Sequence, residues 1–338
     1  MLRTTKQKKN LLFLHSFTVL NIISKLKIKF THLKAKKSHN HAMKKESTNI
    51  YLIGMIVAML FWGFAWTAGK VAAEHSNAEV AAFWRYAISF ISIIPIIWYL
   101  KTPLKTDRKG LMYMVIAGIL TSLFNYLFFA GLSHGNAGYG GTMVTSLAPI
   151  ITYILSISFL GTKVSARQIG ALSIGILGAL ILLRVPFEGF AFLNIDSAYF
   201  LGCAIVWGLV TVVSQKAAKR ADLMFYTLVV FGITTFINML FALPHRPFDF
   251  RAYDEVFWWT ILFIGVIPGT FSTALYFVSA GKVGAHRTGV FMFIVPVGAI
   301  VSSWVVYGET LAISTLFGCL MAFMAVILFN MRKAKGAT

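Results

Sequence analysis

Acidic residues are scarce in this chain of 338 residues. It has 11 Asp and Glu against 31 Lys and Arg, and only 12% of its residues carry charge. Roughly a quarter of the residues of a typical soluble domain are charged, whereas 58% of the residues here are hydrophobic and the mean hydropathy is +0.75. These proportions exclude a soluble globular protein and predict an integral membrane protein.

Cysteine is also nearly absent, and so are the motifs of several enzyme classes. Cys203 and Cys319 lie in different apolar segments without metal-ligand spacing, which favours packing roles over zinc or redox chemistry. The sequence has no nucleotide-binding loop and no nucleophile with a placed base. We therefore expect no cofactor and no metal, and the sequence argues against a nucleotide-driven pump and a hydrolase.

The excess of positive charge does not indicate a nucleic-acid-binding protein. The net charge is +20, but the Lys and Arg residues lie in short runs between apolar segments rather than along one polar face. Cytoplasmic loops of membrane proteins carry such an excess of Lys and Arg. The charge distribution therefore predicts how the chain is oriented in a membrane.

Residues 1–49 contain twelve Lys or Arg and a single acid, Glu46. Their one apolar run, 11–23, is interrupted by polar residues and is too short to span a bilayer. No small-residue cleavage site follows it, as a signal peptide would require. We predict a basic, disordered tail on the inner leaflet; the alternative is that translation begins at Met43 and that residues 1–42 are an artefactual extension.

Ten apolar segments follow, each near the roughly 20 residues that a bilayer core requires. The predicted spans are 50–73, 79–100, 110–131, 137–160, 166–184, 197–216, 222–243, 256–280, 284–307 and 311–331.

The positions of the positive charges agree with ten spans and both termini inside. In that topology 26 of the 31 Lys and Arg fall in cytoplasmic segments. The segments on the other side hold only Arg184, Arg246 and Arg251, while Lys70 and Arg85 fall within helices. The distribution predicts a multi-pass protein of the bacterial inner membrane with both termini cytoplasmic.

The chain contains two copies of one unit, predicted at 50–184 and 197–331. A Tyr-x-x-x-Ala-Gly sequence begins at Tyr126 and again at Tyr276. In each copy a proline also precedes a glycine by twelve residues, Pro149 to Gly161 and Pro296 to Gly308. Five helices per copy is an odd number, so the second copy must cross the membrane in the opposite sense. We predict an all-α integral membrane protein of ten transmembrane helices in two inverted five-helix repeats, an architecture suited to alternating access.

This ordered set of motifs resembles the EamA family of the drug/metabolite transporter superfamily over residues 50–331. The motifs are Trp62-Gly63 leading to Lys70, Trp207-Gly208 leading to Lys216, Arg85 near the start of the second helix, and the two proline-to-glycine ends. The resemblance implies a secondary carrier of small organic solutes, commonly an exporter, with a central cavity lined mainly by helices 1, 3, 4, 6, 8 and 9. The family typically ends the fourth helix of each half with Gly-Glu, which Gly308-Glu309 keeps and Gly161-Thr162 does not.

Two charged residues fall inside predicted spans, where charge is costly and often functional. Lys70 and Arg85 are expected at similar depth in helices 1 and 2, where they could attract an anionic or carboxylate-bearing substrate. In the alternative interpretation Lys70 pairs with Glu74 or extends its amine to the interface, and Arg85 holds helix ends together.

The other candidate substrate-binding residues are polar, aromatic or flexible side chains at matching depths of the two repeats. Polar groups in helices 3 and 8 could hydrogen-bond a solute or a neighbouring helix. The glycines beside two of the tryptophans would allow close approach at a cavity wall, and two methionines would add an adaptable lining. These candidates are Asn125, Tyr126, Ser272, Tyr276, Trp62, Trp207, Met143 and Met292.

No carboxylate or imidazole is expected at mid-membrane, so the sequence does not support a proton-coupling residue there. Glu74, Glu79 and Glu309, near the outer face, are the only substitutes. These three with His75 are also the only loose candidates for the alternative function, an integral-membrane enzyme acting on lipid-linked substrates. A sensor or assembly factor would need a soluble domain, for which the internal loops are too short. The expected partners are a small organic solute and the lipid bilayer, with no nucleic acid; a homodimer remains an open alternative.

Overall fold

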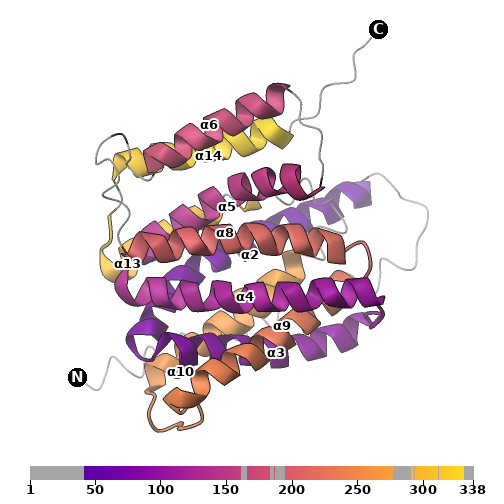
Figure 1. Cartoon of the computed structure of the whole chain (residues 1–338), viewed down its shortest axis with the longest axis vertical. Coiled ribbons are helices and arrows are strands. Elements are labelled where there is room, and N and C mark those ends of the chain that lie inside the picture. Colours follow the sequence, from indigo (N-terminus) through magenta and orange to yellow (C-terminus); the bar gives the residue numbers. More distant parts are fainter. Residues whose placement is uncertain are drawn as a thin grey trace. The chain divides into compact units, whose positions relative to one another are not determined.

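A computed structural model describes residues 42–160, 166–182, 186, 195–276, 291–292, 294–310 and 312–330. These residues are helical apart from short connections and contain no strand (Figure 1), so the predicted all-α fold class is confirmed. The chain divides into two compact units, 1–50 and 51–338. The packing described below is that of the second unit.

The helices follow one another in the order expected of two successive sets. In the first half they are α2 (Ala42–Glu74), α3 (Ala78–Leu100), α4 (Arg108–His134), α5 (Ala137–Leu160) and α6 (Ala166–Leu182). In the second half they are α8 (Ile195–Ala217), α9 (Leu223–Ala242), the short 3₁₀ helix η2 (Leu243–His245), α10 (Glu255–Ile264), the π-helix η3 (Gly265–Ser272), α13 (Ile294–Tyr307) and α14 (Ile313–Asn330).

Six stretches of the described residues are long and apolar enough to cross a membrane. They are Ile53–Glu74, Ala78–Leu100, Arg108–His134, Ser197–Ala217, Leu223–His245 and Glu255–Tyr276. The other predicted spans correspond to α5, α6, α13 and α14, and part of the predicted ninth span, 284–307, lies outside the described residues. The count of ten crossings therefore stays a prediction, as do the form of the tail before Ala42 and its start site.

Three of the few aspartates begin helices by accepting backbone hydrogen bonds. Asp107 accepts from the N–H of Gly110 at 2.7 Å, Asp222 from that of Met224 at 2.7 Å, and Asp254 from that of Phe257 at 2.9 Å. Such caps satisfy N–H groups that have no partner within the helix. The scarce acids thus fix where α4, α9 and α10 start.

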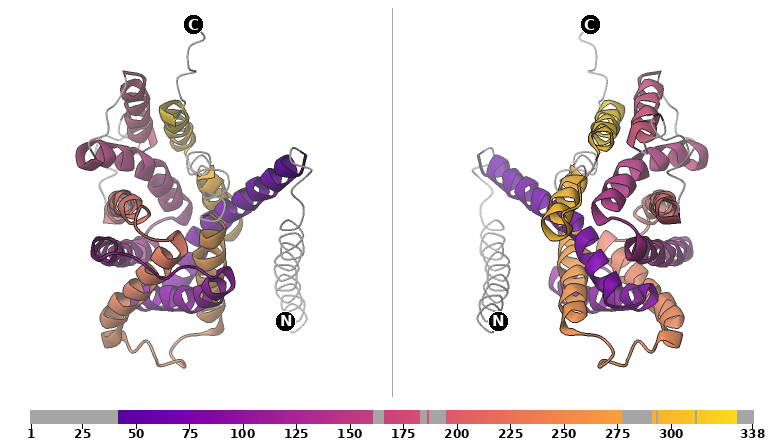
Figure 2. Two further views of the ribbon diagram at one scale, coloured as in Figure 1. Left: turned by 90° about the vertical axis from the view of Figure 1, so that its right-hand side faces the viewer. Right: turned by 90° about the vertical axis from the view of Figure 1, so that its left-hand side faces the viewer.

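Corresponding helices of the two halves pack against each other. The contacts pair α3 with α9, α5 with α13, and α6 with α14. These are the second, fourth and fifth helices of the two halves. Figure 1 and both views of Figure 2 show α6 beside α14. In addition α8 packs on α4 and α5, and α3 packs on η3.

Glycines set the closest helix crossings. A Cβ atom on Gly63 in α2 would come within 2.7 Å of backbone atoms of Gly298 and Ala299 in α13. A Cβ on Gly208 in α8 would lie 2.8 Å from Ile151 in α5. The two tryptophan–glycine pairs therefore occupy equivalent crossings, each between the first helix of one half and the fourth helix of the other, where small residues let helices approach closely.

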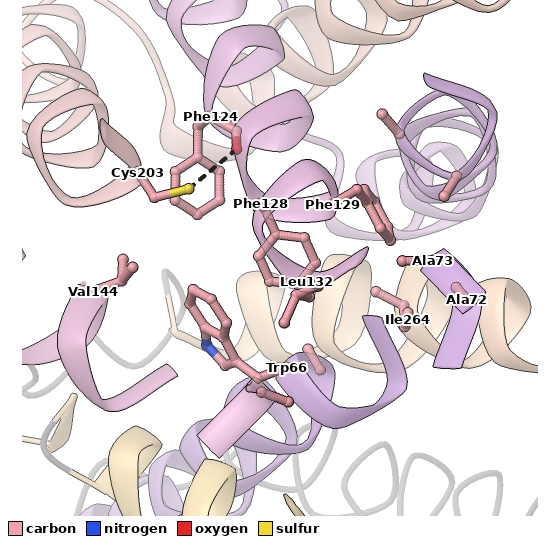
Figure 3. Packing of buried hydrophobic residues seen from close by; sticks show 14 of the residues in the cluster. Trp66, Ala72, Ala73, Phe124, Phe128, Phe129, Leu132, Val144, Cys203 and Ile264 are labelled. Carbon is pink, nitrogen blue, oxygen red and sulfur yellow. Dashed lines mark hydrogen bonds between the residues drawn. The ribbon is translucent and has the colours of Figure 1, made fainter. Parts of the chain in front are cut away.

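Large aromatic side chains fill the core beside these crossings. Trp66 packs on Phe128 with ring centroids 4.8 Å apart, and Phe128 meets Phe129 edge to face at 5.0 Å. Figure 3 shows this cluster, with Cys203 directing its sulfur to the carbonyl oxygen of Phe124 at 3.7 Å. Cys203 is buried and acts as a packing residue, as its sequence context predicted.

Gly63→Ala should destabilise the protein by about 1–3 kcal/mol, because the new methyl group meets backbone atoms that cannot move aside easily. The measurement is thermal unfolding in detergent. Gly170→Ala, in α6, is the matched control, since its Cβ would have no atom within 4 Å. Equal melting temperatures for the two variants would contradict a tight crossing of α2 and α13.

Candidate functional site

A cavity of about 440 Å³ lies among helices of both halves. Its volume falls in the range of sites for small organic molecules, roughly 300–1,000 Å³. The described residues that line it are Trp62, Ala65, Trp66, Arg85, Tyr86, Ser89, Thr121, Phe124, Phe128, Val144, Thr145, Ala148, Pro149, Thr152, Tyr153, Trp207, Val210, Thr211, Ser214, Gln215, Tyr226, Thr227, Val230, Phe231, Pro268, Gly269, Thr273, Tyr276, Met292 and Val295.

Several helices contribute a stripe at helical spacing. In α5, for example, the lining residues form adjacent pairs that recur four positions apart: Val144 and Thr145, Ala148 and Pro149, and Thr152 and Tyr153. The stripes carry aromatic rings and hydroxyl groups, and among the described lining residues there is no Asp or Glu. The cavity is therefore largely apolar, with hydrogen-bonding groups distributed over its wall.

Arg85 supplies the one cationic side chain among the described lining residues. Its guanidinium carbon lies 4.6 Å from the ring centroid of Phe128, 5.7 Å from that of Tyr86 and 6.0 Å from that of Phe129. Cation–π contacts of this kind stabilise a desolvated guanidinium without neutralising it. A positive charge thus remains at the wall of an apolar cavity.

A network of amides behind the wall orients Arg85. The side-chain oxygen of Asn125 accepts a hydrogen bond from Arg85 Nη1 at 3.3 Å, and its Nδ2 donates to the carbonyl oxygen of Ala82 at 2.8 Å. Asn238 donates to the same carbonyl at 3.3 Å and accepts from the hydroxyl of Ser122. Because both amides are buried and satisfied, they hold the guanidinium in a defined place.

The π-helix η3 forms another part of the wall. Pro268 lies inside it and has no N–H to donate, which interrupts the regular hydrogen-bond pattern. The carbonyl oxygen of Pro268 accepts from Trp62 Nε1 at 2.9 Å, and that of Gly265 accepts from Ser89 Oγ at 2.9 Å. The irregular backbone thus binds α2 and α3 to the second half at the level of the cavity.

One end of the bundle is closed by an ion pair between the halves. Lys70 Nζ, near the end of α2, donates to Glu309 Oε1 at 2.8 Å, and both side chains are largely buried. Glu309 also accepts from Ser303 and from the N–H groups of Ala137 at 3.2 Å and Gly138 at 2.9 Å, the first residues of α5. Lys70, Glu309 and Gly138, here called the end clamp, thereby join three helix ends.

Gly308 makes the end clamp possible. Its φ of +66° lies in the left-handed region that glycine adopts at no steric cost. The chain turns back after α13, so that Glu309 accepts a hydrogen bond from Ser303 in the last turns of that helix. The corresponding Gly161-Thr162 of the first half lies outside the described residues.

The cavity extends toward the opposite end of the bundle. Gln215 and Ser214 at the end of α8 and Tyr226 at the start of α9 line it, and Gln215 is exposed. That end also carries the ion pair of Arg220 with Asp107. Next to the end clamp, by contrast, Trp66 and Phe128 are 4% and 2% exposed. The cavity is thus covered on the clamp side and reaches toward the other side.

The structure brings five of the ten proposed substrate-binding residues to the cavity wall. These are Trp62, Trp207, Arg85, Tyr276 and Met292. Trp62 packs against Tyr276 at a tilt, with ring centroids 5.5 Å apart, and Trp207 packs against Phe124 in the same way at 5.0 Å.

The other five lie elsewhere, and their positions have clear physical reasons. Asn125 stands behind Arg85, and Lys70 pairs with Glu309 rather than with Glu74. Tyr126 is 38% exposed on another face of α4 from the lining residues of that helix.

Ser272 and Met143 are fully buried away from the lining. The Ser272 hydroxyl has no hydrogen-bond partner among the described residues. The hydroxyl of Thr121, which does line the cavity, also has no partner among them.

Several lining residues were not singled out from the sequence. Phe124 and Phe128 in α4, and Thr145 and Tyr153 in α5, are examples. Their helical spacing relative to one another was the available signal. That signal cannot show whether a stripe faces a cavity, a neighbouring helix or lipid.

The ionisation of Glu309 bears on the question of proton coupling. Burial raises the pKa of its carboxyl group. Hydrogen bonds from Lys70, Ser303 and the Gly138 N–H, together with the charge of Lys70, lower the pKa by more than burial raises it, so the net pKa lies below the ordinary 4.5. A carboxylate with a depressed pKa keeps its ion pair above that ordinary value and loses it as the pH falls through the lower one.

Glu309 should therefore stay ionised throughout the neutral and mildly acidic range, and the end clamp should be insensitive to pH there. Infrared difference spectra between the wild type and Glu309→Gln, recorded during a pH titration, measure this directly. A protonated-carboxyl band that disappears in the variant at neutral pH would contradict the expectation.

Comparison with known proteins gives a consistent result over both halves. The model of the EamA-like transporter family matches residues 49–184 and again 197–331. The uncharacterized transporter YoaV of Bacillus subtilis is 23% identical over 295 residues, covering 83% of this chain and 98% of that protein. The S-adenosylmethionine uptake transporter of Rickettsia bellii is 23% identical over 265 residues, covering 75% and 84%.

A solved crystal structure shows the same fold. It superposes with a TM-score of 0.57 at 16% sequence identity, covering 83% of this chain and 96% of that one.

Proposed function

Because the chain belongs to the EamA-like transporter family, we propose that it is a secondary transporter that moves small organic solutes across the bacterial inner membrane by alternating access. Its apolar helices and family make it a multi-pass membrane transporter. The observation that carries the proposal is the cavity, which lies among helices of both repeats, is covered at one end and extends toward the other.

The orientation of equivalent helices supports two inverted repeats. Glu309, two residues after the end of α13, accepts from the first N–H groups of α5, and the two helices pack on each other, so these equivalent helices run antiparallel. The start of α3 likewise meets the end of α9, where Asn77 contacts His245 at 3.2 Å. Two antiparallel copies of one unit can exchange conformations, so that a central site faces one side and then the other.

The end clamp supplies a contact that must break in such an exchange. It joins α2 and α5 of the first repeat to the end of α13 of the second. With both termini cytoplasmic, as the charge distribution predicts, the clamp lies at the outer face and the cavity reaches toward the cytoplasm.

Efflux is the direction that we propose, on the basis of the family resemblance alone. The relative from Rickettsia bellii is named for uptake. Uptake is therefore the alternative that a measured flux decides.

The geometry supports transport better than catalysis on lipid-linked substrates. Glu74 contacts Tyr307 at 2.8 Å, His75 contacts Asp254 at 2.7 Å, and Glu79 lies 3.8 Å from His245. Together with Glu309, these candidate catalytic groups lie in contacts between helix ends, and none of them is among the lining residues of the cavity.

A flux screen with the purified protein in liposomes tests the proposal. Amino acids, nucleosides and cationic drugs are offered with and without a pH gradient. Thr145→Trp should reduce any observed flux to background, because the indole fills the cavity. Ile154→Trp is the control, since this residue of the same helix is 42% exposed and does not line the cavity. Equal flux in both variants would show that solutes do not pass through this cavity.

Glu309→Gln should shift the protein toward the state that is open on the clamp side, because Lys70 loses its ionic partner. Thr67→Cys reports this shift, since Thr67 is 4% exposed beside the clamp and bonds to Ser302 at 2.6 Å. Labelling by an impermeant maleimide should accelerate about tenfold, as a change of about 1.4 kcal/mol would give.

The labelling is measured in a background that carries Cys203→Ala and Cys319→Ala. Glu255→Gln, in the first turn of α10, is the control and should leave the rate unchanged. A rate unaffected by Glu309→Gln would remove the clamp from the transport cycle.

A further inference from the structure

Resting on the proposed function, we propose that the cavity selects organic monoanions, compounds with a planar apolar body and a single carboxylate, and that Arg85 binds the carboxylate. Three observations carry this substrate class: the incomplete hydrogen bonding of Arg85, the absence of acids from the described wall, and the aromatic rings around it.

Most N–H groups of the Arg85 guanidinium have no acceptor among the described residues. A guanidinium carries five N–H groups, and among the described residues that of Arg85 donates one hydrogen bond, to Asn125 at 3.3 Å. It forms no ion pair with any described carboxylate, whereas Lys70 on the same half is paired with Glu309 at 2.8 Å. The contacts with Phe128, Tyr86 and Phe129 are with ring faces, which accept no conventional hydrogen bond.

A carboxylate is the group that completes this site. Its two oxygens match the planar fork of a guanidinium and can accept two parallel hydrogen bonds. A buried charge without a counter-ion is costly in an apolar environment. An anionic solute would supply the missing charge, and this gives the cavity a reason to prefer anions over neutral solutes of the same shape.

The same wall disfavours cations and zwitterions. The polar groups near Arg85 are hydroxyls, such as that of Thr121, and no described lining residue is an acid that could receive an ammonium group. A cation would be repelled by Arg85, and the ammonium of a zwitterion would be left without an ionic partner. S-adenosylmethionine carries a sulfonium and an ammonium, so we expect this chain to differ in substrate from the uptake transporters it resembles.

The aromatic residues account for the body of the solute. Trp62 packs against Tyr276, and Trp207 against Phe124, at the wall of the cavity. Phe128 lies against Arg85 itself. A flat apolar group would contact these rings while its carboxylate meets the guanidinium.

Asn125 acts as a positioning residue. Its oxygen accepts from Arg85 while its amide nitrogen is held by the Ala82 carbonyl, so the side chain cannot turn to the solute without losing a buried hydrogen bond. Asn125→Asp therefore places a carboxylate beside Arg85 with almost no change of shape. The substitution also removes the hydrogen bond to the Ala82 carbonyl, which Asn238 still donates to. The introduced carboxylate would neutralise the charge of Arg85 in place of a substrate carboxylate.

Four probes that share a phenyl ring and differ in charge test the inference. They are 3-phenylpropionate, L-phenylalanine, phenethylamine and 3-phenylpropionamide. Binding to the purified full chain is measured by quenching of tryptophan fluorescence, because Trp62 and Trp207 line the cavity, and is checked by calorimetry. We expect 3-phenylpropionate to bind at least about tenfold more tightly than each of the other three.

The variants separate charge from structure. Arg85→Gln and Asn125→Asp should each weaken 3-phenylpropionate binding about tenfold or more while leaving the neutral amide within about twofold. Arg85→Lys keeps the charge and should retain part of the preference for the anion. This result would show that the loss of binding in Arg85→Gln comes from the missing charge and not from failure to fold. Arg251→Gln, an exposed loop cation outside the lining, should change nothing.

Three outcomes would each overturn the substrate class. They are tighter binding of phenylalanine or phenethylamine than of 3-phenylpropionate, an anion preference that is unchanged in Arg85→Gln and Asn125→Asp, and no binding of any probe. These outcomes are distinct from failure of the proposed function. A protein that binds the anion through Arg85 but moves no solute in the liposome screen would retain the site and lose the role of transporter.

Discussion

A positive charge held at the wall of an apolar cavity is the constraint around which the centre of this protein is arranged. Arg85 is only partly exposed, and three aromatic faces and one amide surround its guanidinium. That amide in turn requires the Ala82 carbonyl, which Asn238 shares. The helices α3, α4 and α9 are thereby fixed to one another beside the cavity, and the charge stays at the cavity wall.

Of the two cations within the first two helices, Lys70 has an acidic partner and Arg85 has none among the described residues. Lys70 lies near a helix end, where Glu309 can approach from the second repeat and neutralise it. Arg85 lies deeper, and no described carboxylate reaches it. One cation therefore joins the repeats at the closed end, while the other faces the cavity. Lys70 is therefore paired with Glu309 and is not among the lining residues of the cavity.

Much of the fold was predictable because a bilayer leaves few choices. Helices are required wherever the backbone enters lipid, so apolar runs near 20 residues long predicted α2, α3, α4, α8, α9 and the stretch through α10 and η3. The site was predicted less completely. Trp62, Trp207 and Tyr276 reached the wall, whereas the repeat suggested that Tyr126 would match Tyr276, and it is instead 38% exposed. Internal similarity fixes a residue's place along a helix but not the rotation of that helix against its neighbours.

The sequence by itself determined the membrane-embedded helical class, the two repeats and the family, because hydropathy, spacing and motif order are properties of the chain alone. Only the tertiary structure decided which helix faces line a cavity, which cation remains without an acidic partner, and how Glu309 closes one end. These features depend on contacts between residues more than 150 positions apart, such as Lys70 with Glu309 and Trp62 with Pro268. Periodicity along one helix carries no information about such contacts, since they arise when two halves pack together.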